Sequence, residues 1–203
     1  MQIAHRSGRV FYNAGRIMPS LCVFCGSLNS IASPFIAAAR ETGRLLGESG
    51  WTLIYGGARN GMMGALATAA LAAGGRVVGV IPQSLVDREV AHTGLSELRV
   101  VPSLQERKTL MSELSDAFLT LPGGFGTLDE LFEVLTWSML GYHDKPCALL
   151  NTARYYDDLL AFVQQAADKG FVPPRFSRVL LVASDPAAAL GLLSSALAAT
   201  PGA

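Results

Sequence analysis

The sequence has little of several things that would point to particular protein classes. Among its 203 residues, 16 basic side chains balance 16 acidic ones, which gives a formal net charge of +0. Without an excess of positive charge, we expect no general nucleic-acid partner and no anionic membrane surface. No apolar run reaches the roughly 18 residues that a membrane-spanning helix needs, so we expect no membrane partner of that kind either.

Cysteine is also scarce, with three residues in the chain. Cys22 and Cys25 have the spacing of half a zinc or redox motif, but they fall in a predicted strand, where residues three apart point to opposite faces. With Cys147 they are expected to be buried thiols of a cytoplasmic protein. The three histidines are scattered without metal-ligand spacing. We therefore expect no metal site and no organic cofactor.

Two common nucleotide-binding motifs are missing. A dinucleotide site would place Gly-x-Gly-x-x-Gly directly after the first strand, but the chain reads Gly26-Ser27-Leu28-Asn29-Ser30 there. A P-loop needs Gly-Lys followed by Ser or Thr, and the sequence has no such string. Any phosphate-binding loop in this chain must be of another kind.

The segments that are present alternate between strand and helix. Half of the residues are hydrophobic, enough for one large core. The alternation predicts an α/β fold: a single-domain, Rossmann-like, doubly wound parallel sheet with helices on both faces. The expected strands are 21–25, 51–55, 76–81, 98–101, 116–121, 146–150 and 179–182, and the expected helices are 34–48, 65–73, 155–167, 186–198 and those starting near 103 and 128.

The first twenty residues differ from the rest. They carry Arg6, Arg9 and Arg16, no acidic residue, and no apolar stretch of the roughly 7–15 residues found in a secretory signal. We expect residues 1–20 to be a flexible extension, or Met18 to be the natural start. The catalytic, nucleotide-binding domain is expected to occupy residues 21–203.

A glycine-rich turn after the fifth expected strand is the main functional signal. The apolar run 116–121 leads into Pro122-Gly123-Gly124-Phe125-Gly126-Thr127, and apolar residues then recur at helical spacing. Such a turn lets backbone N–H groups and the helix dipole meet a phosphate. Glu130 lies at the mouth of this anion site. Because like charges repel, it either caps the helix, as the Thr-x-x-Glu spacing of a capping box allows, or takes part in chemistry.

The helix after Ser103 offers the matching cations. Ser103 and Glu106 fit a capping box, and Arg107 and Lys108 follow in the second turn. A cation that close to a helix N-terminus is unfavourable by roughly 0.3–1 kcal/mol. The pair is therefore either solvated surface charge or aimed at an anion. Because ligands of such sheets bind beyond the carboxyl ends of strands, we expect Gly26-Ser27, the loop from Gly56-Gly57 to Gly64, and the glycine turn to converge on one cleft.

These motifs resemble the Lonely Guy (LOG) family of phosphoribohydrolases. The family's Pro-Gly-Gly-x-Gly-Thr-x-x-Glu is matched without a gap by Pro122 to Glu130, and its upstream Arg-Lys pair by Arg107-Lys108. The resemblance extends over about residues 21–171. The second glycine loop also matches, with Ala58 in place of the usual glycine. Gln105 stands where the family usually has histidine, and Leu28-Asn29 also departs from its pattern.

The resemblance implies hydrolysis of the N-glycosidic bond of nucleoside 5′-monophosphates, above all N6-modified adenosine 5′-monophosphates (cytokinin activation), with AMP as another substrate. It assigns catalysis to Arg107 and Glu130. It also implies a homodimer, for which Trp137, Met139, Leu140 and Tyr142 supply apolar surface. Substrate binding is assigned to Glu89, Lys108, Gly123, Gly124, Gly126, Thr127, Thr136, Gly26, Ser27, Gly56 and Gly57.

Two other functions have been weighed against the hydrolase. A non-catalytic nucleotide- or cofactor-binding carrier on the same fold stays open, although a carrier has no need of the Glu130 carboxylate. Lysine decarboxylase, a name attached to similar sequences, requires a lysine that forms a Schiff base with pyridoxal phosphate. Lys108, Lys145 and Lys169 lie in no such sequence setting, and we reject that reaction.

Overall fold

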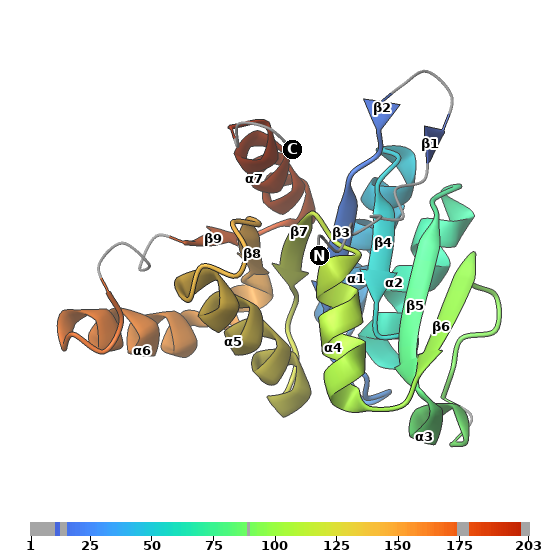
Figure 1. Ribbon diagram of the computed structural model, residues 1–203, viewed down its shortest axis with the longest axis horizontal. Coiled ribbons are helices and arrows are strands. Elements are labelled where there is room, and N and C mark those ends of the chain that lie inside the picture. The colour runs from blue at the N-terminus through green and yellow to red at the C-terminus, as the bar shows by residue number, and fades with distance from the viewer. Residues whose placement is uncertain (1–10, 13–15, 89, 174–178, 200–203) are drawn as a thin grey trace, which may run out of the picture.

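The computed structural model describes residues 11–12, 16–88, 90–173 and 179–199, which contain a seven-stranded sheet (Figure 1). Its strands are β3 (Ser20–Phe24), β4 (Thr52–Tyr55), β5 (Val77–Pro82), β6 (Glu97–Val101), β7 (Ala117–Thr120), β8 (Cys147–Leu150) and β9 (Leu180–Ala183). Their order in the sheet is β6-β5-β4-β3-β7-β8-β9, and all neighbouring strands are parallel.

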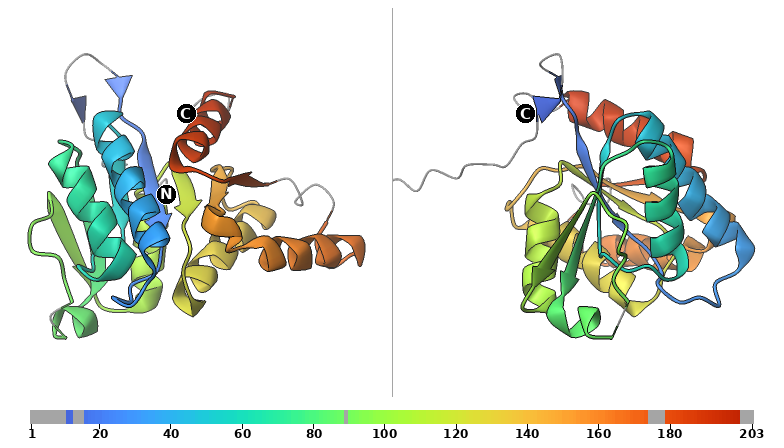
Figure 2. Two further views of the ribbon diagram at one scale, coloured as in Figure 1. Left: turned by 180° about the vertical axis from the view of Figure 1, so that it is seen from behind. Right: turned by 90° about the vertical axis from the view of Figure 1, so that its right-hand side faces the viewer.

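Helices cover both faces of this sheet (Figure 2). On one face lie α1 (Ser33–Glu48), α2 (Gly61–Ala72) and α7 (Pro186–Ala199), and on the other lie α4 (Leu104–Glu113) and α5 (Phe125–Met139). The helix α6 (Asp157–Asp168) packs beside α5, with Leu159 and Leu160 against the buried Leu131. The predicted fold class is confirmed.

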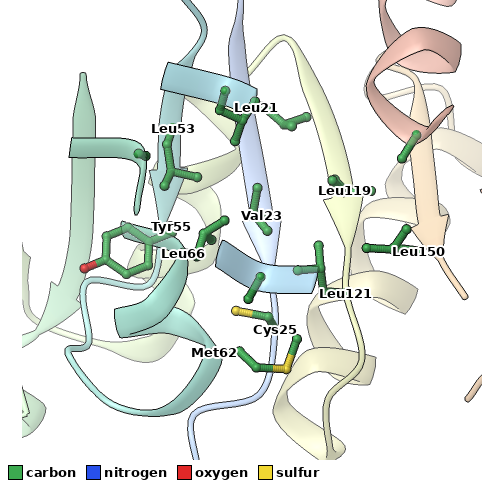
Figure 3. Packing of buried hydrophobic residues seen from close by; sticks show 14 of the residues in the cluster. Leu21, Val23, Cys25, Leu53, Tyr55, Met62, Leu66, Leu119, Leu121 and Leu150 are labelled. Carbon is green, nitrogen blue, oxygen red and sulfur yellow. The ribbon is translucent and has the colours of Figure 1, made fainter. Parts of the chain in front are cut away.

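The core divides along β3 with the two-residue period of a strand. Leu21, Val23 and Cys25 point into the cluster shared with α1, α2 and α7, part of which is shown in Figure 3. Cys22 and Phe24 point into the cluster on the opposite face, which α4 and α5 cover. Cys22 and Cys25 are therefore on opposite faces, as predicted, and both thiols are buried and free.

The direction in which successive strands are added to the sheet reverses at β3, and the candidate site lies at this point. From β3 the strands run outward to β6, and the chain then returns to place β7 on the other side of β3. Open α/β sheets bind ligands at such a switch point, beyond the carboxyl ends of the two strands. There the Gly26 N–H donates to the Pro122 carbonyl at 3.1 Å, and the Met62 N–H donates to the Gly26 carbonyl at 3.1 Å. The three glycine loops therefore meet, as predicted.

Several helix boundaries differ from the predicted ones, and for α2 a residue from a distant loop accounts for the difference. Helix α2 begins at Gly61, not at residue 65, since Asn29 Oδ1 accepts from the Gly61 N–H at 3.0 Å. Helix α5 begins at Phe125 rather than near residue 128. Helix α6 begins two residues late, after the turn η1 (Thr152–Arg154), and the short helix α3 (Gln83–Val86) was not predicted.

At the N-terminal end, β1 (Phe11–Tyr12) pairs antiparallel with β2 (Arg16–Ile17), and β3 begins at Ser20. The short ladder was not predicted, and the flexibility of residues 1–20 stays a prediction. Of the helices that the structure describes, none combines the length and apolar character that crossing a membrane requires.

Candidate active site

Glu130 lies in the second turn of α5 with 9% of its surface exposed. The N-cap of this helix is Gly124, with an extended backbone at φ −97° and ψ −152°. Thr127 is therefore the third residue of the helix and cannot be its cap, so the capping-box alternative for Thr127 and Glu130 is wrong. The Glu130 carboxylate is left facing the space between α5 and α4.

Arg107 reaches the same space from α4. Its Nη1 lies 3.4 Å from Glu130 Oε1, and its Nε–H donates to the Val80 carbonyl at 3.1 Å. The guanidinium lies so close to the Gly56 backbone that a Cβ on Gly56 would overlap it. With 13% of its side chain exposed, Arg107 is not the solvated surface charge that one alternative predicted.

The start of α4 holds Arg107 in place. Ser103 is the N-cap, and its Oγ accepts from the Glu106 N–H at 3.1 Å while donating to Glu106 Oε1 at 3.0 Å. The N-cap half of the predicted capping box is confirmed, whereas Glu106 Oε1 bonds the Ser103 hydroxyl instead of the Ser103 backbone N–H. The Ser103 side chain satisfies one orphan backbone donor of the first turn, that of Glu106, and so fixes the start of the helix that carries Arg107.

Glu130 has an unusual affinity for protons. Burial raises its pKa most strongly, the Arg107 cation lowers it, and the nearby Asp129 carboxylate raises it again, so that the pKa is about 7 instead of 4.5. A carboxylate with a pKa near neutrality can accept or hold a proton at working pH. Among titratable groups in a cleft, such a combination of burial and a specific charged partner marks a candidate catalytic residue.

Lys108 lies next to Arg107 but makes different contacts. Its Nζ is 3.0 Å from Asp129 Oδ2 and 3.1 Å from Glu133 Oε1. Burial lowers the pKa of Lys108, but the hydrogen bonds to the two carboxylates outweigh burial and raise it. The Lys108 ammonium is therefore already neutralised by α5, whereas the Arg107 guanidinium faces Glu130.

The first turn of α5 presents free backbone donors. In the described part of the chain, no acceptor meets the N–H groups of Gly124, Phe125, Gly126 and Thr127. The helix has no side-chain cap, and the first amide to be paired is that of Leu128, which donates to the Gly124 carbonyl at 3.0 Å. Uncapped amides at the positive end of a helix dipole form an anion site.

A cavity of about 570 Å³ joins these groups, a size common for small-ligand sites. It brings together the acid–cation pair of Glu130 and Arg107, the start of α5, and the end of β3. Its lining residues are Cys25, Ser27, Met63, Ser103, Leu104, Gln105, Arg107, Lys108, Gly126, Asp129 and Glu130.

Comparison with known proteins identifies the family of the chain. A family model described as possible lysine decarboxylase matches residues 63–193. The chain is 49% identical to a cytokinin riboside 5′-monophosphate phosphoribohydrolase of Rhodococcoides fascians, over 87% of this chain and 89% of that protein. It belongs to the LOG family. A probable enzyme of the same name from Oryza sativa subsp. japonica is 46% identical over 80% of this chain and 66% of that protein.

The LOG-family chain also matches solved structures. A molybdenum cofactor binding protein from the phototrophic bacterium Rippkaea orientalis superposes with a TM-score of 0.70 at 24% identity, over 90% of this chain and 98% of that one. At this identity the likeness shows the shared fold alone.

Not every residue that the LOG resemblance assigned to the substrate lies at the cavity. Ser27, Lys108 and Gly126 line it together with Arg107 and Glu130. Gly26, Gly56, Gly123 and Gly124 belong to the loops around it, and Thr127 lies in the first turn of α5. Gly57 turns away, since its carbonyl accepts from the His92 N–H at 2.9 Å. Thr136 is exposed, its hydroxyl donates to the Phe132 carbonyl at 2.6 Å, and it is not among the lining residues. Glu89 lies outside the described residues.

Sequence reasoning did not name several lining residues, among them Cys25, Met63, Leu104 and Asp129. Cys25 and Met63 could have been found, because Cys25 directly precedes Gly26 and Met63 lies within the loop from Gly56 to Gly64, both of which were expected to converge on the cleft. Leu104 and Asp129 carried no signal of their own, since they depend on how α4 and α5 are rotated about their axes.

Proposed function

We propose that this LOG-family protein hydrolyses the N-glycosidic bond of nucleoside 5′-monophosphates and releases the free base and ribose 5-phosphate. The observation that carries the proposal is the buried Glu130, with a pKa of about 7 and Arg107 Nη1 at 3.4 Å, beside the free amides that start α5. A carboxylate and an anion site in the same cavity suit a phosphorylated sugar.

The reaction needs few groups. As the base leaves, positive charge develops on the sugar ring, and water attacks the same carbon. The Glu130 carboxylate would stabilise that charge and accept a proton from the water. The hydroxyl ends on the ribose carbon, and the proton passes from Glu130 to the released base. Arg107 would hold the ribose phosphate and keep Glu130 oriented. The amides of Gly124 to Thr127 would bind the 5′-phosphate.

The substrate class follows from the relatives. Those with 42–49% identity are named cytokinin riboside 5′-monophosphate phosphoribohydrolases. We therefore propose N6-modified adenosine 5′-monophosphates as substrates, with AMP as a second one. Gln105, which lines the cavity where the family usually has histidine, and the exposed Leu28 are the residues at which base preference would differ.

The two alternatives have less support. A molybdenum cofactor carrier protein from Chlamydomonas reinhardtii shares only the fold, at 24% identity, and a carrier would have no use for the raised pKa of Glu130. Decarboxylation, which the family description suggests, needs a neutral lysine amine for a Schiff base. Lys108 instead has a raised pKa. Lys145 Nζ donates to the Ser112 carbonyl at 2.7 Å, and Lys145 is not among the residues that line the cavity.

We also propose a homodimer that acts in the cytoplasm. Apolar side chains are exposed along α5 and just beyond it, with Phe125 at 94%, Phe132 at 41%, Leu140 at 62% and Tyr142 at 75%. Burying such a surface against a second copy would remove it from water. Light scattering at micromolar concentration should give twice the mass of one chain, and a monomer there would contradict the dimer.

The function itself is tested by product analysis. Purified protein is incubated with AMP, isopentenyladenosine 5′-monophosphate, or adenosine, and the products are separated. A hydrolase would release one molecule of ribose 5-phosphate for each molecule of free base from either nucleotide. It would release little free base from adenosine, which lacks the phosphate. Adenosine plus inorganic phosphate would indicate a phosphatase, and tight nucleotide binding without any turnover would indicate a carrier.

A further inference from the structure

Two adjacent tyrosines hold the glycine loop from the α6 side. Tyr155 Oη donates to the Gly123 carbonyl at 2.8 Å, and Tyr156 Oη donates to the Leu121 carbonyl at 2.9 Å. Neither residue lines the cavity. Both therefore act on the loop from behind, on the side away from the ligand space.

The bond from Tyr155 determines where one amide points. In a trans peptide the C=O of one residue and the N–H of the next lie in one plane and point in opposite directions. Holding the Gly123 carbonyl toward Tyr155 therefore turns the Gly124 N–H away from Tyr155, and that N–H has no acceptor in the described chain. A Gly-Gly peptide has little steric resistance to rotating about its flanking bonds, so it needs such a restraint more than other peptides do.

The bond from Tyr156 serves another purpose. The residue after Leu121 is Pro122, which has no N–H to direct. Tyr156 is 2% exposed, so its hydroxyl and the Leu121 carbonyl that accepts from it are both withdrawn from water. Tyr156 therefore satisfies a buried backbone group at the end of β7, and this contributes to folding rather than to the direction of a free donor.

The turn before the tyrosines has an unfavourable conformation. Ala153 and Arg154 have φ of 52° and 61°, the left-handed region that non-glycine residues rarely adopt, and Thr152 Oγ1 is buried without a partner in the described chain. Asn151 Oδ1 accepts from the Tyr156 N–H at 2.7 Å and holds the turn closed. Strain of this kind persists where surrounding contacts maintain it, and such sites are enriched near functional groups.

From these contacts we infer that Tyr155 is a positioning residue for phosphate binding. It fixes the Gly123–Gly124 peptide so that the Gly124 N–H stays directed at the 5′-phosphate of the substrate. The inference rests on the proposed function only in the identity of the ligand. The contact between Tyr155 and the loop would act equally on inorganic phosphate.

The test compares Tyr155→Phe with Tyr156→Phe, each of which removes one hydroxyl that donates to the same loop. Tyr155→Phe keeps the ring contacts with Phe35 and Tyr156. Its affinity for AMP and for inorganic phosphate, measured by calorimetry, should fall about three- to tenfold, the equivalent of one ordinary hydrogen bond. Affinity for adenosine should stay the same, and the melting temperature should change little. Tyr156→Phe should lower the melting temperature by several degrees and leave phosphate affinity within about twofold.

Kinetics add a second readout. The phosphate is held equally in the ground and transition states, so Tyr155→Phe should raise KM for AMP by the same factor with kcat nearly unchanged. Unchanged phosphate affinity in Tyr155→Phe, or an equal loss of adenosine affinity, would overturn the inference. If the wild type binds phosphate but does not hydrolyse AMP, the proposed reaction is wrong, and the binding comparison still decides the role of Tyr155.

Discussion

Replacing Glu130 by glutamine separates the chemistry of this residue from its structural role. The substitution keeps the side-chain size and one acceptor oxygen but removes the negative charge 3.4 Å from Arg107. A charge that stabilises the transition state of a buried site is worth about 2.7–4 kcal/mol, or 100- to 1000-fold in rate. We expect Glu130→Gln to lower kcat for AMP by at least about 100-fold while nucleotide binding persists or tightens, because an anion near the phosphate is gone.

The same substitution should stabilise the fold in a pH-dependent way. The pKa of Glu130 is raised from 4.5 to about 7, so the folded protein resists ionisation of this carboxyl. The resulting loss of stability is absent below pH 4.5, grows as the pH rises, and is complete above about pH 7. At about 1.36 kcal/mol for each pH unit between the two values, the total is about 3 kcal/mol. Glutamine cannot ionise, so the variant avoids this loss.

The assay measures both effects on the same preparations. Release of adenine from AMP gives the rate, and urea unfolding at pH 5 and pH 8 gives the free energy of unfolding. The advantage of Glu130→Gln over the wild type should grow by about 2–3 kcal/mol between the two pH values. Glu133→Gln is the matched control, because Glu133 lies on the same helix, bonds Lys108 and does not line the cavity. A Glu130→Gln protein that hydrolyses AMP at close to the wild-type rate would refute the catalytic assignment.

Two further predictions concern the same pair of residues. Arg107→Ala should cut kcat/KM for AMP by at least about 100-fold. It should also move the acid limb of the pH–rate profile to higher pH, because Arg107 lowers the pKa of Glu130. An unshifted limb would show that the two side chains act independently. In the wild type, kcat/KM should fall about tenfold per pH unit below an apparent pKa of about 7, since the proposed mechanism uses the ionised form of Glu130. A profile that is flat from pH 5 to pH 8 would contradict this.

Much of the fold could be predicted because its strands are buried on both faces and read as apolar runs. The glycine turn and the Arg107-Lys108 pair were also visible. What remained open was whether Thr127 and Glu130 form a cap, since a cap and a catalytic carboxylate can share the same spacing. The start of α5 decided this. It lies at Phe125 because Gly124 is extended and the Gly26 N–H holds the Pro122 carbonyl, a contact across nearly a hundred residues.

The directions of side chains and their remote partners could not be predicted either, because they depend on contacts between segments that are far apart in the sequence. Arg107 and Lys108 are neighbours of the same charge, but the rotation of about 100° between successive helical residues sends one to Glu130 and the other to Asp129. The cap that Asn29 provides for α2 comes from a distant loop. The tyrosines that bond the glycine loop follow a turn in which Ala153 and Arg154 have positive φ. A glycine at either position would have indicated such a turn in the sequence, but neither residue is glycine.

The division of work between the two cations follows from the charges around them. Three carboxylates of α5, those of Asp129, Glu130 and Glu133, lie near an anion site, and a phosphate there would be repelled by all of them. Lys108 bonds Asp129 and Glu133 and so neutralises the two that have no proposed role in the reaction. One of the five donors of Arg107 is bound to the Val80 carbonyl, and Glu130 is the carboxylate beside the others, so the planar guanidinium can serve a carboxylate and a phosphate at once. A lone cation on α4 could not do both tasks, and this explains why a basic pair is placed at an electrostatically unfavourable helix start.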